Sequence, residues 1–174
     1  MTEIICLLGT GKARAGKETV ARMLKEELVK ADKRVLITHF ADPLKLICRN
    51  WFNWDGRMND EGRSLLHYVG TDIVRARLPN FWVDFTLSLL SIMGDEWDYV
   101  IIPDCRWPNE LDFERHGFRT RHIQIESRRV ATGVHTPERL PGKSAPEFII
   151  VNDESSPDKL RREVEAVAQC LIFG

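Results

Sequence analysis

The stretch from Glu3 to Ala31 restricts the fold of this chain more than any other. It begins with an apolar run at Ile4–Leu8, continues through a glycine-rich segment at Gly9–Thr19, and ends in a helical repeat. The apolar residues of that repeat share one helix face: Val20, Met23, Leu24, Leu28 and Ala31. We therefore expect a buried strand, a glycine-rich turn and an amphipathic helix that starts at the turn. Backbone N–H groups would then converge where the helix dipole favours an anion.

The turn itself matches a phosphate-binding pattern. Gly11 to Lys17 reads G-x-x-x-x-G-K, in which loop amides hold phosphates and the lysine reaches the terminal ones. The Ser or Thr that usually follows the lysine, as a Mg²⁺ ligand, is replaced by Glu18, and Thr19 comes next. One alternative is a turn that uses glycine only for its backbone geometry. Another is a dinucleotide-binding loop with the pattern G-x-G-x-x-G. With Gly9 and Gly11 as its first two glycines, the third would fall at position 14, which is Arg14.

Composition and charge narrow the class of protein. A chain of 174 residues with 43% apolar residues suits one domain with a substantial core. A net charge of −1 gives no electrostatic reason to bind a nucleic-acid polymer, so small anions are the expected ligands. No run has the length of a membrane span and no secretory signal is present, which predicts a cytoplasmic protein without a membrane partner. The scattered cysteines are expected to be small buried hydrophobes: Cys6, Cys48, Cys105 and Cys170.

Beyond the first helix, strand and helix patterns alternate. Further strands are expected at residues 35–40, at 99–104, near the sheet edge at 120–125, and at 148–151. Helices are expected to open at Pro43, to cover 61–78, 79–93 (a core helix) and 108–116, and to run from a Ser156 N-cap to Leu171. Strand–helix–strand repeats imply right-handed crossovers into a parallel sheet. The fold class is therefore α/β, a doubly wound five-stranded parallel sheet flanked by helices.

Two acids follow predicted strands. Asp42 comes where the second strand ends and Pro43 opens a helix, at the carboxyl edge where open α/β sheets bind ligands. Asp42 would alternatively cap that helix. Asp104 ends an apolar run, as the acid of a Walker B strand does beside a phosphate loop. Its alternative role is to cap a helix that starts near Pro108.

Basic residues gather in two other segments. Along the helix predicted at 61–78, polar residues recur every four positions: Arg63, His67, Thr71 and Arg75. Arginines at this spacing cannot pair with each other, so the stripe is either a solvated surface or the wall of an anion site. Residues 127–144, which include Arg128 and Arg129, show no periodicity. Such a segment is either a functional lid or a disordered loop.

Four ordered motifs give the chain a resemblance to a known family. They are residues 11–19, 40–45, 70–75 with Trp82-Val83, and 104–110. In this order they resemble the deoxynucleoside monophosphate kinases of phages and bacteria, and the resemblance covers nearly the whole chain. That family often has an acid and a threonine after the loop lysine, which Glu18-Thr19 matches. The resemblance implies a P-loop kinase fold in one domain, with an acceptor-binding insert near 42–94 and a lid near 127–144.

The same resemblance implies an activity and a set of site residues. The expected reaction transfers the γ-phosphoryl group of ATP to a deoxynucleoside monophosphate, with Mg²⁺, commonly in a homodimer. The ATP site would comprise Gly11, Lys12, Ala13, Arg14, Ala15, Gly16, Lys17, Glu18 and Thr19. Catalysis would depend on Lys17, Asp104, Arg128 and Arg129, with Glu18 or Asp104 holding the metal. The acceptor site would comprise Asp42, Lys45, Arg63, Thr71, Arg75, Trp82, Asp104 and Arg106.

Two other functions stay open. A kinase of another small phosphorylated acceptor, such as phosphomevalonate, would share the phosphate loop. A nucleotide-binding switch would hold a nucleotide without an acceptor. Against a switch of the GTPase kind, the chain has no Asn-Lys-x-Asp guanine signature. The long insert between the second and third strands also suits an acceptor pocket, which a switch does not need.

Overall fold

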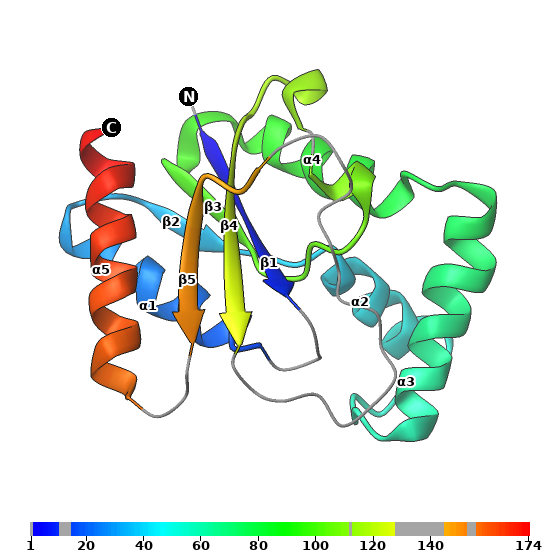
Figure 1. Cartoon of the computed structure of the whole chain (residues 1–174). Helices are drawn as coiled ribbons and strands as arrows, with labels where there is room; N and C mark the ends of the chain where they lie inside the picture. Colours follow the sequence, from blue (N-terminus) through cyan, green and yellow to red (C-terminus); the bar gives the residue numbers. More distant parts are fainter. Residues whose placement is uncertain (1, 11–14, 112, 128–144, 153–155) are drawn as a thin grey trace. The chain divides into compact units, whose positions relative to one another are not determined.

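The computed structural model describes residues 2–10, 15–111, 113–127, 145–152 and 156–174. They form two compact units, which we name the sheet unit (Met1–Thr38 with Gly94–Gly174) and the helical unit (His39–Met93). The strands of the sheet unit are β1 (Glu3–Thr10), β2 (Val35–Ile37), β3 (Tyr99–Ile102), β4 (Arg119–Ser127) and β5 (Phe148–Asn152). Its long helices are α1 (Lys17–Lys30) and α5 (Pro157–Phe173) (Figure 1). Over the described residues, every helix is too short or too polar to span a bilayer.

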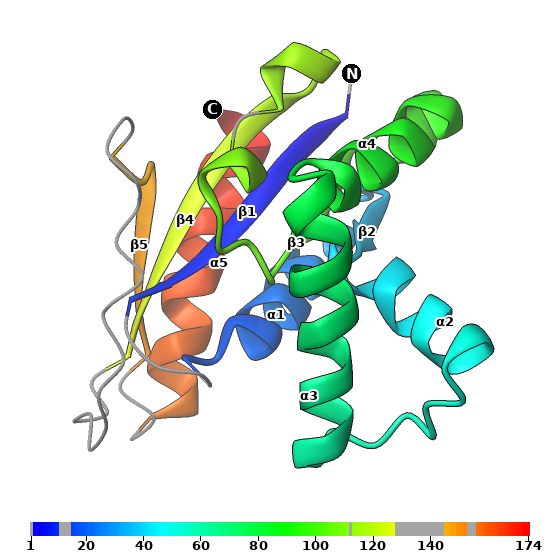
Figure 2. The ribbon, with the colours of Figure 1, turned by 90° about the vertical axis from the view of Figure 1, so that its right-hand side faces the viewer.

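The strands form one sheet in the order β2-β3-β1-β4-β5 (Figure 2). All four pairings are parallel. Between β1 and β4 the register runs from Glu3 opposite Arg119 to Thr10 opposite Glu126. Strand β1 lies at the centre, and its run Ile4–Leu8 is buried on both faces, as an unbroken apolar run requires. The predicted α/β fold, a five-stranded parallel sheet flanked by helices, is confirmed.

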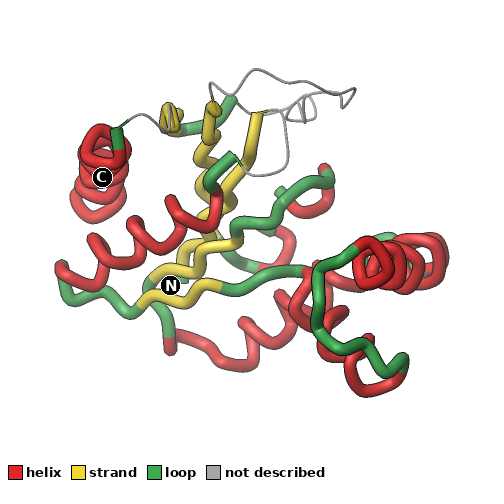
Figure 3. The backbone as a smooth tube through the Cα atoms, turned by 90° about the horizontal axis from the view of Figure 1, so that it is seen from below, coloured by secondary structure: helices red, strands yellow, loops and turns green. Residues whose placement is uncertain are grey.

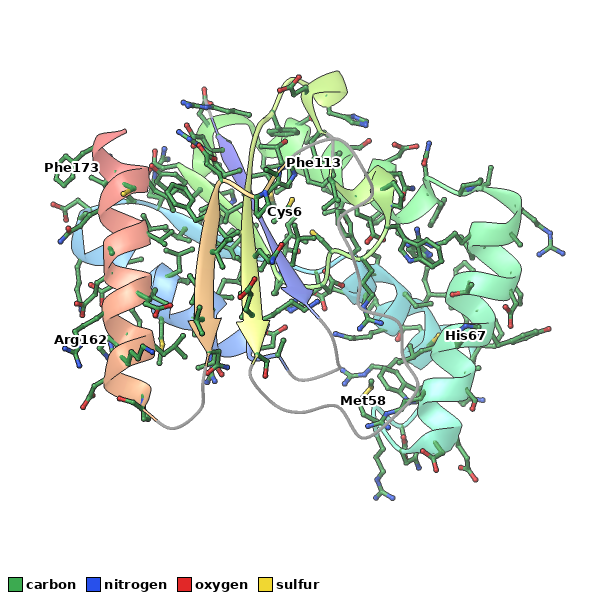
Figure 4. The ribbon with its side chains drawn as sticks, viewed as in Figure 1. Cys6, Met58, His67, Phe113, Arg162 and Phe173 are labelled. Atoms are coloured by element: carbon green, nitrogen blue, oxygen red, sulfur yellow. The ribbon has the colours of Figure 1, made fainter. Side chains whose placement is uncertain are left out.

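One face of the sheet packs on α1 and α5, which lie on the same side of the strands in Figure 3. Ile5 and Leu7 of β1 point into this core, and the alternate residue Cys6 points to the opposite face. The two helices contribute Val20, Leu24, Leu28, Leu160, Val164 and Leu171. On the opposite face the Cys6 thiol donates to the carbonyl of Glu110 at 3.7 Å, so the segment after β3 covers that side. Cys6 and the fully buried Phe113 are labelled in Figure 4.

Strand β4 lies next to the edge strand β5, so it is near the sheet edge, as its alternation of polar and apolar residues predicted. The internal position is possible because Arg121, only 9% exposed, forms ion pairs with Glu3 and Glu147. The outer strand is β5, where the Val151 N–H donates to a side-chain oxygen of Glu163 on α5 at 2.6 Å. That contact occupies a backbone donor of an edge strand.

Several smaller predictions fail. The second strand ends at Ile37 rather than at residue 40. The helix predicted at 108–116 is replaced by two short 3₁₀ turns, Pro108–Glu110 and Glu114–His116. Gly117 follows with a left-handed φ of 78°, as a helix-terminating glycine should. Of the four cysteines, Cys170 is exposed rather than buried.

The helical unit contains α2 (Ala41–Trp51), α3 (Asp60–His67), the π-helix η1 (Tyr68–Arg75) and α4 (Phe81–Met93). A small core of Cys48, Trp54 and Val69, with Leu65 and Leu66 packed against it, joins α2, α3 and η1. Helix α4 was predicted to be core on all sides, but one face is exposed. Its exposed apolar residues are Phe85, Leu89, Ile92 and Met93. Two of them border a groove of about 560 Å³ that residues 78–89 line.

A π-helix interrupts the helix predicted at 61–78. Helix α3 continues directly into η1, in which Gly70 packs closely on α2. A Cβ at position 70 would lie 2.6 Å from Cδ2 of Leu44, so a larger residue there would displace the Leu44 side chain. The Gly70 carbonyl accepts the indole N–H of the buried Trp82 at 3.1 Å. Contacts from α2 and α4 thus meet at one glycine.

Candidate functional site

The turn between β1 and α1 lies at the carboxyl edge of the sheet. Gly16 is the N-cap of α1 and has a left-handed φ of 89°. Because glycine has no side chain, Gly16 makes no side-chain cap to this helix. The N-terminal end of a helix favours an anion through its N–H groups and its dipole. The phosphate site itself stays a prediction, since residues 11–14 lie outside the described ranges.

The side chain of Lys17 lies over the end of β1. A Cβ on Gly9 would lie 3.6 Å from Cδ and 3.7 Å from Cε of Lys17. The same atom would lie 3.3 Å from Cβ of Ala15. A Cβ at position 9 would thus touch the lysine stem at ordinary contact distance and would lie slightly too close to Ala15. Sequence analysis did not single out Gly9, because it precedes the G-x-x-x-x-G-K pattern.

Asn152, the last residue of β5, holds the same turn. Its side chain is 7% exposed, and Nδ2 donates to the carbonyl oxygen of Ala15 at 3.1 Å. A Cβ on Gly16 would collide with the same amide nitrogen. Ala15 and Asn152 are 137 positions apart in the sequence, so no local pattern could reveal their contact.

Asp104 lies at the same edge of the sheet unit. Strands β1 and β3 are parallel, and Ile102 of β3 lies opposite Cys6 of β1. Asp104 follows Ile102 by two residues, so it lies nearer the carboxyl edge at which β1 also ends. Its side chain is half-buried. The alternative that Asp104 caps a helix at Pro108 is wrong, because only a 3₁₀ turn starts there and its N-cap is Trp107.

Glu110 shapes the loop that carries Arg106. Its side chain is 2% exposed, and Oε2 accepts the backbone N–H of Arg106 at 2.6 Å and of Trp107 at 2.9 Å. The Arg106 side chain is exposed. Beside it, burial first and the neighbouring Cys6 second raise the pKa of the Cys105 thiol well above its usual value. Cys105 is thus a neutral core residue and not a nucleophile.

In the helical unit, Asp42 forms a local network. One oxygen of its carboxylate is 3.1 Å from both the backbone N and Nδ1 of His39, and the other is 3.1 Å from Nζ of Lys45. Burial raises the pKa of Asp42, but the hydrogen bonds and charges of Lys45 and His39 outweigh it, so the pKa lies below its usual value. Helix α2 starts at Ala41, so Asp42 also supports its first turn.

The predicted polar stripe runs across two types of helix. Arg63 and His67 lie on α3, whereas Thr71 and Arg75 lie on the π-helix. His67, labelled in Figure 4, has Nδ1 3.5 Å from a carboxylate oxygen of Asp72. The single stripe and the acceptor roles of both arginines stay predictions.

Part of the predicted site lies outside the described residues. This part comprises Gly11, Lys12, Ala13, Arg14, Arg128 and Arg129, with the rest of the predicted lid from 130 to 144. In the first turn of α1, Glu18 is exposed and Thr19 is half-buried. Within the described ranges no three metal-ligating side chains cluster. A Mg²⁺ ion often has only one or two protein carboxylates and uses substrate phosphates for the rest, a set that Glu18 or Asp104 could complete.

Comparison with known proteins identifies the fold. No protein-family model matches the chain, and no curated protein matches it by sequence. A cysteine-to-alanine mutant of the APS kinase CysC from Mycobacterium tuberculosis matches with 13% identity, 98% of this chain and 94% of that chain covered, and a TM-score of 0.51. The same kinase in complex with AMPPNP and APS matches with 11% identity and a TM-score of 0.51, and the match covers 99% of this chain and 97% of that chain. The crystal structure of APE1195 matches with 12% identity and a TM-score of 0.53, and the match covers 98% of this chain and 95% of that chain.

This chain shares the fold of these APS kinase structures. The match extends over nearly the full length of each neighbour. At such low identity the likeness establishes the fold and nothing finer. A shared fold hosts many acceptors, so the substrate must be argued from the site.

Proposed function

We propose that the chain is an ATP-dependent kinase that converts a deoxynucleoside monophosphate to the diphosphate. The turn between β1 and α1 carries this proposal. Three features support a site for a metal-bound polyphosphate: a helix start without a side-chain cap at Gly16, a lysine stem beside Gly9, and an acid at the same sheet edge. The P-loop kinase fold and the four ordered motifs support the same assignment.

On the donor side, the chain positions ATP and neutralises its charge. Lys17 and the loop amides bind the β- and γ-phosphates, and Thr19 binds the α-phosphate. Magnesium, when bound with ATP, supplies the remaining positive charge, and Glu18 or Asp104 holds it directly or through water. Phosphoryl transfer needs little covalent chemistry from the protein, so placement and electrostatics supply most of the rate enhancement.

On the acceptor side, permanent cations are needed, because the acceptor phosphate must approach another polyanion. We assign Arg106 of the sheet unit and Arg75 of the helical unit to that phosphate, with Arg63 as a further candidate. Asp42 and Trp82 are assigned to the nucleoside, with Lys45 and Thr71 in the same site. No general base is required, because the acceptor phosphate is already an anion. Arg128 and Arg129 would reach the transferring group when the predicted lid excludes water.

The direct test is a coupled assay of ADP formation with Mg²⁺-ATP and each common nucleoside or deoxynucleoside monophosphate. We expect ADP formation to depend on a deoxynucleoside monophosphate and to yield its diphosphate in equal amount. Slow ADP formation that no acceptor accelerates would instead indicate a nucleotide-binding switch.

A second candidate is a kinase of another small phosphorylated acceptor. One neighbour with this fold is a kinase in complex with AMPPNP and APS, which favours keeping this candidate. Adding APS and phosphomevalonate to the assay panel distinguishes the two functions. Activity with one of these compounds, and none with a deoxynucleoside monophosphate, would replace the first proposal with the second.

We further propose that the enzyme is a homodimer in the cytoplasm, or in the host cytoplasm if a phage encodes it, as the family resemblance implies. Sedimentation equilibrium at assay concentrations tests the first part. We expect the mass of two chains, each of 20.1 kDa. The mass of one chain would show that the resemblance does not extend to assembly.

A further inference from the structure

A buried amide connects the last strand of the sheet to the turn before α1. Asn152 ends β5, is 7% exposed, and donates from Nδ2 to the Ala15 carbonyl at 3.1 Å. Burying an amide is costly unless its polar atoms are hydrogen-bonded. An apolar residue would fill this space at lower cost if packing were its only role. The bond to Ala15 therefore needs an explanation.

That bond fixes the peptide between Ala15 and Gly16. A trans peptide is planar, and its N–H points opposite to its C=O. With the Ala15 carbonyl held towards Asn152, the N–H of Gly16 points away from Asn152. The same amide also occupies the space where a Cβ of residue 16 would stand, and Gly16 has a φ that favours glycine. The peptide before the helix start is thus held in one orientation.

We propose that Asn152 is a positioning residue for phosphate binding. It orients the Gly16 N–H, and with it the start of α1, before the ligand arrives. Donors that are already oriented need no reorganisation on binding, so their full interaction energy goes into holding the phosphates. The inference deepens the proposed function and rests on it for the identity of the ligand as the phosphates of ATP.

A neighbouring contact supplies the control. The N–H of Val151, one residue before Asn152, donates to the Glu163 carboxylate of α5 at 2.6 Å. This bond also joins β5 to another element through one side chain, but that element is α5 and not the turn. Glu163→Gln should therefore loosen β5 without disturbing the Ala15–Gly16 peptide. Asn152→Ala removes the bond to the turn, and Asn152→Asp keeps the side-chain shape while replacing the donor by an acceptor.

The experiment measures binding of ATP and of tripolyphosphate to the full chain by calorimetry, together with melting temperatures. We expect Asn152→Ala to weaken binding of both ligands about tenfold to a hundredfold, and Asn152→Asp to weaken it at least as much. Glu163→Gln should stay within about twofold of the wild type. In the kinase assay the KM for ATP should rise in both Asn152 variants while the KM for the acceptor holds.

Several outcomes would overturn the inference. It fails if Asn152→Ala binds both ligands like the wild type, or if the two Asn152 variants and Glu163→Gln lose affinity only in proportion to lost stability. A wild-type chain that bound tripolyphosphate but not ATP would refute the proposed function, while the tripolyphosphate comparison would still decide the role of Asn152. A wild-type chain that bound neither ligand would refute both.

Discussion

The phosphate end of the sheet unit and the helical unit arrange their candidate residues in different ways. At the end of β1 the site consists mainly of backbone: a glycine at φ 89°, a helix start without a side-chain cap, and a lysine stem that lies over Gly9. All of this lies within a short stretch of chain. In the helical unit the candidates are side chains on α2, α3, η1 and α4, and their arrangement depends on how those helices pack. A local motif thus specifies the first region, whereas packing specifies the second.

The two regions share one kind of contact, a hydrogen bond from a buried side chain to a backbone carbonyl. In each, a buried side-chain donor bonds a backbone carbonyl from another element of its own unit. Asn152 holds Ala15 in the sheet unit, and Trp82 holds Gly70 in the helical unit, each at 3.1 Å. The comparison predicts that binding of the ATP phosphates depends on residues of the sheet unit. It also predicts that the choice of acceptor depends on residues of the sheet unit and of the helical unit. The predictions below test that division, in decreasing order of expected effect.

Lys17→Ala should reduce turnover by about a hundredfold to a thousandfold, because the lysine neutralises charge on the transferring group. The fold should survive, since the side chain is partly exposed. The control is Lys30→Ala at the other end of α1, where the lysine forms an exposed ion pair with Glu27. Steady-state kinetics and melting temperatures measure the two effects. A Lys17→Ala enzyme with near-normal turnover would remove the phosphate-site assignment.

Arg75→Ala and Arg106→Ala should each raise the KM for the monophosphate about tenfold to a hundredfold, because each loses a charge-assisted hydrogen bond to the acceptor phosphate. ATP affinity should hardly change. Arg77→Ala is the matched control, since its exposed guanidinium bonds only the Ile73 carbonyl among the described residues. If ATP affinity fell and the monophosphate KM held steady, these arginines would belong to the donor site.

Trp82→Phe should lower the free energy of unfolding by about 1–3 kcal/mol, because it removes a buried hydrogen bond to Gly70 and leaves a small cavity. Denaturant titration measures the change. Trp51→Phe on α2 is the control, because that side chain is 78% exposed and its loss should cost under about 0.5 kcal/mol. Equal stability of the two variants would show that the contact at Gly70 does not hold the helical unit together.

Asp42→Asn should have the smallest effect of the four, a small loss in the free energy of unfolding. Burial raises the pKa of Asp42, but Lys45 and His39 together lower it by more than burial raises it. Folding therefore favours the ionised carboxylate. This stabilisation exists above the unfolded-state pKa of about 3.9 and disappears as the pH falls through the lower folded-state pKa. The half-exposed group should contribute less than about 1 kcal/mol at pH 7. Unfolding titrations at pH 7 and near pH 3 should show the wild-type advantage only at the higher pH.

Local sequence signals predicted the strand–turn–helix start, the strand that precedes Asp104, the last strand and the Ser156 cap with good accuracy. Apolar runs, helical periodicity and capping residues act within a few positions, so they can be recognised without tertiary structure. The helix expected at 108–116 and the regular helix expected at 61–78 were wrong for the opposite reason. Glu110 draws two backbone N–H groups into a tight loop, and Leu44 and Trp82 meet at Gly70.

The sequence by itself determined the order of elements, the α/β class and a glycine turn with a lysine at a helix start. Tertiary structure alone decided that Gly9 accommodates the lysine stem, that Asn152 holds the turn, and that a π-helix follows α3 at Tyr68. The physical reason is the range of the interactions. Hydrophobic patterns show which face of an element is buried, but they do not show which distant residue will pack against it. Contacts such as that between Ala15 and Asn152, 137 positions apart, exist only after the sheet has formed.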